Sequence, residues 1–227
     1  MSAEAADNNR GSCPKDGIGP PPPLSIKLPK LSELAKKSKP WSDVQLPVDV
    51  VLVTVDSCEF LACYARMKNV FKSYHRDLGY VFFGNAEEDE GEPLKIALVT
   101  CSGGSSSPGG SQTAVKNAVV QLRPKAVYSV GCCIGLNQEK AQLGDVVVCS
   151  KLTTGDFRTP VGRDIGNLVK FAAHGWEAPL ESPEAREVHV HCDGEILSSI
   201  NQDTFERHKE KYPTAIAVEM EGKGDIS

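Results

Sequence analysis

Short apolar runs without a polar face most constrain the fold of this chain. Residues 48–55, VDVVLVTV, are rich in β-branched side chains and have the length of a strand. Five further runs share this character: Lys95–Cys101, Lys125–Gly131, Asp145–Ser150, Glu187–Cys192 and Thr214–Met220. Strands that are apolar on both faces are typical of parallel sheets covered by helices. The sequence therefore predicts an α/β protein.

Segments with helical spacing lie between these runs. A helix is predicted over residues 57–74, where large apolar residues recur every three or four positions. These residues are Phe60, Tyr64, Met67, Phe71 and Tyr74. The same spacing predicts helices over residues 114–122 and 165–172, and a charged one ending near Pro213. Because strands and helices alternate, residues 46–227 are predicted to form one layered domain.

Residues 1–45 differ in composition from the rest of the chain. A proline run, Pro20–Pro23, precedes a lysine-rich stretch that ends at Lys39. Proline runs favour extended polyproline II, and such a segment lacks the apolar surface for a core of its own. We therefore predict a disordered Pro/Lys-rich tail or linker over residues 1–45, with a Pro-rich docking ligand as the alternative.

Charge and cysteine usage exclude several classes of protein. The net charge is −5, which argues against a nucleic-acid partner because such proteins usually carry a basic excess. Transmembrane helices need about 20 apolar residues, and no run approaches that length. The polar N-terminus lacks the apolar core of a secretory signal. The eight cysteines contain no C-x-x-C pair and are typical of buried thiols in a reducing compartment, which predicts a cytoplasmic protein.

Candidate site residues follow the predicted strands, because ligands bind at the carboxyl ends of strands in open α/β sheets. Glu59 opens a helix after the first strand, a glycine-rich segment over residues 102–110 follows the second, and Gly131 ends the third. A helix cap, a flexible loop and a simple strand exit are the respective alternatives. In the last strand Glu219 and Glu221 share one face, and buried carboxylates are costly unless they are paired or liganded. A solvated edge strand is the alternative there.

A metal site is not predicted. His189 and His191 share a strand face, but the sequence offers no third ligand nearby, and tetrahedral sites need three or four.

Five segments in this order resemble the superfamily of purine nucleoside phosphorylases and methylthioadenosine/S-adenosylhomocysteine nucleosidases. They are VVLVTVDSCEF, the glycine-rich segment over residues 102–110, LRPKAVYSVGCCIGLN, LGDVVVCSKL and YPTAIAVEMEG. The resemblance implies a three-layer α/β/α fold around a mixed, partly barrel-like sheet. It also implies cleavage of the N-glycosidic bond of a purine nucleoside without a cofactor.

The resemblance implies roles for individual residues. Glu59 matches the acid that activates the attacking water, and Glu221 matches the residue that binds the ribose hydroxyls, so these two are the predicted catalytic residues. The predicted ribose- and base-binding residues are Gly131, Cys132, Cys133, Ile134, Asp193, Ile196, Glu219 and Met220. Ser129 and Cys132 stand where the phosphorylases bind phosphate through an arginine and a serine, which favours hydrolysis over phosphorolysis. Ile134 replaces a small residue, and Glu195 replaces the aromatic residue that stacks on the base.

The sequence ends at Ser227, before a strand with a Ser-Asp pair that the family carries. The resemblance therefore predicts a domain truncated at its C-terminus, without the last strand and helix and without the proton donor to the purine. Three functions stay open: a nucleosidase, a catalytically inactive nucleoside-binding or regulatory module, and a non-functional truncation. Family members commonly form oligomers, so a homo-oligomer is an alternative to a monomer.

Overall fold

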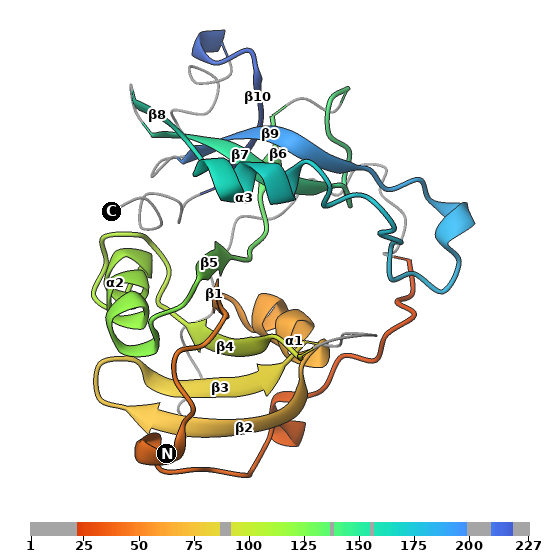
Figure 1. The fold of residues 1–227 in the computed structure, drawn as a ribbon. Coiled ribbons are helices and arrows are strands. Elements are labelled where there is room, and N and C mark those ends of the chain that lie inside the picture. The colour runs from red at the N-terminus through yellow and green to blue at the C-terminus, as the bar shows by residue number, and fades with distance from the viewer. Residues whose placement is uncertain (1–21, 87–91, 137–138, 155–156, 199–209, 220–227) are drawn as a thin grey trace, which may run out of the picture.

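The computed structural model describes residues 22–86, 92–136, 139–154, 157–198 and 210–219. They form two five-stranded sheets, one in each half of the molecule, which the chain joins between β5 and β6 (Figure 1). In spatial order, the first sheet contains β2 (Lys68–His75), β3 (Gly79–Asn85), β4 (Lys95–Thr100), β1 (Val50–Thr54) and β5 (Ala126–Ser129). The second contains β6 (Ile134–Gly135), β10 (Ala215–Glu219), β9 (Val190–Ser198), β7 (Val146–Thr154) and β8 (Phe157–Pro160).

The first sheet is the middle layer of an α/β/α sandwich. Its strands β4, β1 and β5 run parallel, whereas β2 and β3 are antiparallel. Val51 and Val53 pack with α2 (Ser111–Leu122), and Leu52 packs on the other side of the sheet with Phe60 of α1 (Ser57–Ala65). Both faces of the central strands are therefore apolar, as the sequence indicates, and the predicted α/β class is confirmed.

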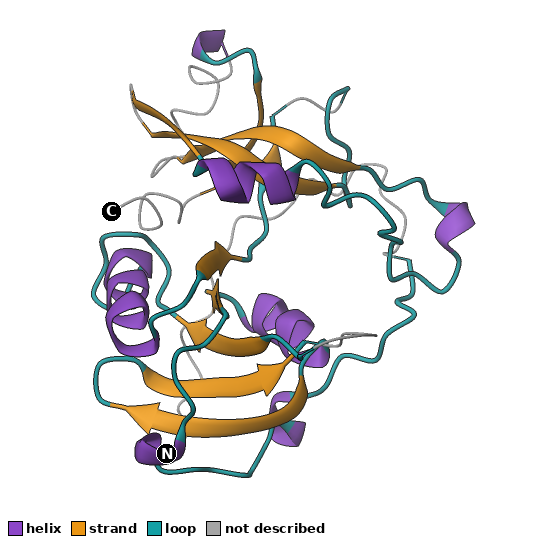
Figure 2. Ribbon diagram, viewed as in Figure 1, coloured by secondary structure: helices purple, strands orange, loops and turns teal. Residues whose placement is uncertain are grey.

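The second sheet has fewer helices around it (Figure 2). Its strands β7, β9 and β10 are parallel, with β8 and β6 antiparallel at the two edges. Helix α3 (Arg163–Val169) contacts β7. Short 3-10 helices lie at Leu31–Glu33, Trp41–Asp43 and Pro183–Ala185. Within the described ranges, no helix has the length and apolar character to cross a bilayer.

The predicted helix over residues 57–74 is wrong beyond Ala65. Helix α1 ends there, and the chain then forms the β2–β3 hairpin. Asn69 adopts a positive φ of 57°, a conformation that asparagine tolerates better than most residues. From there Phe71 and Ser73 face the core opposite Phe83 and Val81, so the strand follows a period of two. The helical spacing of the aromatic residues spans two elements by coincidence.

The predicted helices over residues 114–122 and 165–172 correspond to α2 and α3. The charged helix predicted before Pro213 lies mostly outside the described residues. The six predicted strands correspond to β1, β4, β5, β7, β9 and β10, whereas β2, β3, β6 and β8 were not predicted.

Residues 22–45 contact both halves of the molecule. Residues 37–39 run beside the outer edge of β2, where the Lys39 N–H donates to Lys72 O and the Lys72 N–H donates to Lys37 O. Leu24 pairs with Leu180 on the other half. Trp41 packs against Phe83, so this Pro/Lys-rich stretch makes an apolar contact with the core that its overall composition does not predict. Residues 1–21 lie outside the described residues, and the limits of tail and domain stay a prediction.

Candidate functional site

Glu59 lies where α1 begins, directly after β1. Asp56 is the N-cap residue, and the Glu59 side chain completes a capping box with it. The Glu59 Oε2 atom accepts hydrogen bonds from the N–H groups of Val55 and Asp56, both at 2.9 Å. The local sequence thus fixes one oxygen of the carboxylate at the carboxyl end of the sheet.

The other carboxylate oxygen faces the turn after β5. Glu59 Oε1 accepts a hydrogen bond of 3.1 Å from the Cys132 N–H. A Cβ atom at Gly131 would lie 3.3 Å from this oxygen, which is a tight contact. Gly131 therefore lets the backbone approach the carboxylate closely. The structure brings together Glu59, Gly131 and Cys132, which are three of the residues predicted for the site.

The same turn carries the chain from the first sheet to the second. Ile134 pairs with Val218 in β10, one residue before Glu219. Burial raises the pKa of the Cys133 thiol, and the nearby negative charge of Glu219 raises it further. Burial also raises the pKa of Cys132, followed by the influence of Cys58 and Glu59. The Gly131–Cys133 turn is thus in hydrogen-bond contact with Glu59, and the residue that follows it pairs with Val218, the neighbour of Glu219.

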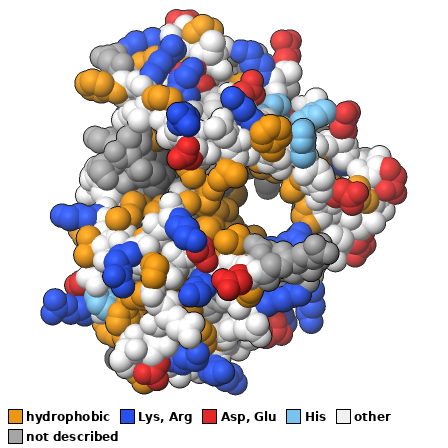
Figure 3. Space-filling view, viewed as in Figure 1, with side chains coloured by type: hydrophobic (Ala, Val, Ile, Leu, Met, Phe, Trp, Pro, Cys, Tyr) orange, Lys and Arg blue, Asp and Glu red, His pale blue; other side chains and the backbone are white. Residues whose placement is uncertain are grey.

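The residues predicted to line the purine have different environments. Ile196 is 8% exposed, and Asp193 is exposed to solvent. Ile134 is 55% exposed within the turn. Met220 and Glu221 lie outside the described residues. Figure 3 shows an opening between the two halves, with hydrophobic side chains gathered along its rim.

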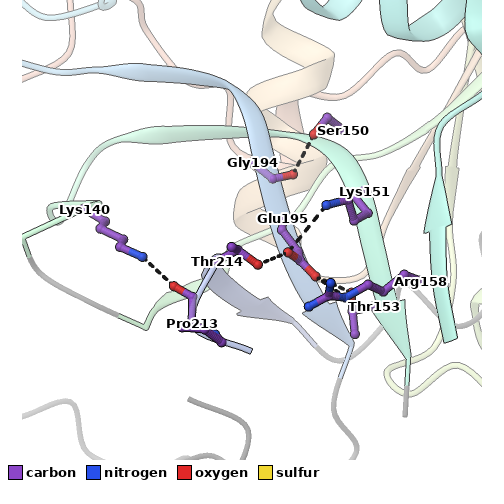
Figure 4. A network of polar contacts seen from close by, with 9 residues as sticks. All are labelled: Lys140, Ser150, Lys151, Thr153, Arg158, Gly194, Glu195, Pro213 and Thr214. Atoms are coloured by element: carbon purple, nitrogen blue, oxygen red, sulfur yellow. Dashed lines mark hydrogen bonds and ion pairs between the residues drawn. The ribbon is translucent and has the colours of Figure 1, made fainter. Parts of the chain in front are cut away.

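Glu195 is the centre of a polar network on β9 (Figure 4). Its side chain is only 3% exposed and accepts hydrogen bonds from the hydroxyls of Thr153 at 2.7 Å and Thr214 at 2.5 Å. Arg158 Nε lies 3.2 Å and Lys151 Nζ 3.7 Å from its oxygens. Burial alone would raise the pKa of Glu195, but the two hydroxyls and the two cations outweigh burial and lower it.

The glycine-rich segment after β4 is held by its own hydrogen bonds. The Ser107 hydroxyl donates to Gly103 O at 2.6 Å and to Gly104 O at 2.8 Å. A Cβ atom at Gly110, the N-cap of α2, would lie 2.0 Å from Gly104 O, so only glycine fits there. Beside this loop is a shallow cavity of about 420 Å³, lined in part by Thr100, Thr113 and Asn117.

His191 belongs to a structural pair. Its Nε2 atom lies 3.0 Å from Asp145 Oδ2, and the His189 N–H donates to the other carboxylate oxygen. Burial would raise the pKa of Asp145, but these hydrogen bonds outweigh it and lower it. In the part of the chain that the structure describes, no three His, Cys, Asp or Glu side chains gather as metal ligands.

Two further polar residues, Ser198 beside Glu219 and Thr154 one strand beyond it, were not singled out in the sequence. Thr154 pairs with Ser198 in β9, and Ser198 pairs with Glu219 in β10. No motif marks them, because their proximity depends on the register of three strands that are distant in the sequence.

Comparisons with known proteins come from structure and from sequence. No family model matches the chain. A 5′-methylthioadenosine/S-adenosylhomocysteine nucleosidase from Colwellia psychrerythraea, solved with adenine, superposes with a TM-score of 0.60 at 14% identity, covering 78% of this chain and 74% of that one. The S-adenosylhomocysteine nucleosidase of Streptococcus pyogenes has a TM-score of 0.58 at 17% identity, and the match covers 80% of this chain and 77% of that one. Futalosine hydrolase of Helicobacter pylori has a TM-score of 0.53 at 14% identity, and the match covers 78% of this chain and 76% of that one.

These likenesses show that the chain has the nucleosidase fold, and they confirm the resemblance at that level. A curated relative is similar in sequence: a death domain-containing ATP nucleosidase from Amphimedon queenslandica is 27% identical over 142 residues, which are 48% of this chain. The match covers 26% of that relative, so the chain spans about a quarter of its length.

Proposed function

We propose that this chain cleaves the N-glycosidic bond of a purine nucleoside by hydrolysis. The observation that carries the proposal is the Glu59 carboxylate, held between the two halves of the molecule by three backbone N–H groups. Nucleosidases of the same fold and the ATP nucleosidase relative support this reaction class.

Glu59 has the geometry of a general base for water. A carboxylate offers about four acceptor positions, and the three N–H groups occupy three of them. One position remains to accept a hydrogen bond from a water molecule. Because these contacts orient the carboxylate without a flexible partner, the base is preorganised for proton abstraction.

The sugar side of the reaction needs negative charge. Departure of the base builds positive charge on the ribosyl ring, as in other glycosidic cleavages. Glu59 contacts the Gly131–Cys133 turn, and Glu219 follows the β10 residue that pairs with Ile134, so we propose that a ribose bound at this turn has both carboxylates near it. We propose Glu221 and Met220 as further ribose contacts, and Asp193, Ile134 and Ile196 near the base.

Hydrolysis is favoured over phosphorolysis by the charge around the turn. The carboxylates of Glu59 and Asp56 are among the groups that raise the pKa of Cys132, after burial and Cys58, and Glu59 Oε1 accepts the Cys132 N–H. Phosphate would be repelled there, and Ser129 replaces the arginine that the phosphorylases use. Water is therefore the better nucleophile for this site.

The test is release of free base from methylthioadenosine, adenosine, inosine, AMP and ATP, measured by chromatography with and without phosphate. We expect phosphate-independent release, and Glu59→Gln should lower kcat by about 10²–10⁴-fold. The glutamine oxygen can still accept hydrogen bonds from Val55 and Asp56, whereas its NH2 group would face the Cys132 N–H, so the Tm is measured beside kcat to separate catalysis from folding. Glu33→Gln, on the exposed 3-10 helix Leu31–Glu33, serves as the matched control.

Two results would redirect the proposal. Phosphate-dependent release would replace hydrolysis with phosphorolysis. Thermal stabilisation by a nucleoside without release of base would favour a nucleoside-binding module, and the absence of both release and stabilisation would contradict the proposed function.

A further inference from the structure

Three polar side chains form a row at the carboxyl end of the second sheet. Thr154 ends β7, Ser198 ends β9 and Glu219 ends β10. Thr154 is in register with Ser198, and Ser198 is in register with Glu219. Directly paired residues on neighbouring strands project from the same face of a sheet. The Ser198 hydroxyl therefore lies next to the Glu219 carboxylate, and the Thr154 hydroxyl lies one strand further along the same face.

This row lies on the face of the sheet that also carries Ile196. Side chains alternate along a strand, so Ile196 and Ser198 project from one face of β9, and Glu195 projects from the other. The same alternation separates Thr154 from its neighbour Thr153, whose hydroxyl donates to Glu195. The sheet therefore has a face with a complete polar network and a face with the hydroxyl row.

The hydroxyl of Thr154 lacks a hydrogen-bond partner among the described residues, although its Oγ1 atom is buried. Ser198 is buried as well, at 7% exposure. Buried polar atoms in native proteins nearly always have a partner, and each exception calls for an explanation. A bound ligand would supply the partner that the described residues do not.

We propose that Thr154 and Ser198 form a hydroxyl subsite for the polar edge of a purine base, with Glu219 toward the ribose; this inference rests on the proposed function. Neighbouring strands lie about 4.8 Å apart, so the row extends over about 10 Å. A hydroxyl both donates and accepts, so the subsite matches a 6-amino and a 6-oxo substituent equally. The chain should therefore discriminate weakly between adenine and hypoxanthine.

The experiment measures binding of free adenine, hypoxanthine and unsubstituted purine to the full chain by calorimetry, together with the Tm of each variant. Thr154→Val should weaken the binding of adenine and hypoxanthine by about three- to tenfold, which is the effect of one hydrogen bond. It should weaken the binding of unsubstituted purine less. Because the variant removes a buried hydroxyl without a partner, the Tm of the ligand-free chain should rise. Thr154→Ser should restore affinity, and Ser198→Ala should weaken both substituted bases.

Thr153→Val is the matched control, because it removes the same hydroxyl from the adjacent position on the opposite face. It should lower the Tm and leave the affinities for adenine and hypoxanthine, relative to that for unsubstituted purine, unchanged. If Thr154→Val lowers the Tm without affecting base binding, the hydroxyl is structural and the subsite is refuted, while base release by the unaltered chain would keep the proposed function intact. If the unaltered chain neither binds a base nor releases one, both proposals fail together.

Discussion

The two sheets of this protein are stabilised in different ways. The first sheet is apolar on both faces, and helices cover its central strands on each side. The second carries a buried carboxylate network on one face and a row of polar side chains on the other. The first therefore relies on burial of apolar surface, while the second combines a small apolar cluster around Leu197 with buried polar pairing.

Each of the two sheets contributes one carboxylate to the candidate site. The first sheet supplies one carboxylate, Glu59, which is held by backbone N–H groups at a strand end and a helix start. The second supplies Glu219 through the pairing of β10 with β9. Substitutions in the first core should therefore act on stability, whereas polar substitutions in the second should act on stability and on the site.

The largest expected effect is in the first core. Leu98 is fully buried next to Phe60, so Leu98→Ala should lower the free energy of unfolding by about 2–5 kcal/mol. Chemical denaturation with a constant m-value would measure this loss. Val119→Ala, at a position that is 47% exposed on α2, is the control and should cost far less. Equal effects would mean that the first sheet does not rely on apolar burial.

A smaller loss is expected from the charged network of the second sheet. Glu195→Gln removes the charge that Arg158 and Lys151 share, but both cations are about half exposed and can regain water. We therefore expect a loss of roughly 1–3 kcal/mol, mainly from weakened hydrogen bonds to the threonines. Glu187→Gln, whose side chain is 83% exposed, is the control for denaturation measurements. A gain in stability would show that the buried charge is a net cost.

The contrast between the two sheets also explains which parts of the fold and of the candidate site the sequence predicts. Apolar runs revealed the parallel strands, and the strand-end rule placed Glu59 near Gly131, because both depend on local patterns. The β2–β3 hairpin was missed because Phe71 and Tyr74 continue the helical spacing of α1. The Glu195 network and the Thr154–Ser198 row were missed because cross-strand register is not encoded in any one segment.

Acidification should have a still smaller effect. The pKa values of Glu195 and Asp145 in the second sheet are lowered in the folded protein, and so is that of Asp49 beside β1, which pairs with Lys125 and accepts from the Lys95 N–H. The stabilisation from these three groups is complete above the ordinary carboxyl range, and it is lost as the pH falls below about 4 and through the lowered values. Glu195→Gln should flatten this loss in denaturation curves, because one of the three groups no longer titrates. Leu98→Ala should shift the whole curve without changing its slope, and an unflattened curve for Glu195→Gln would contradict the contribution of the second sheet to acid sensitivity.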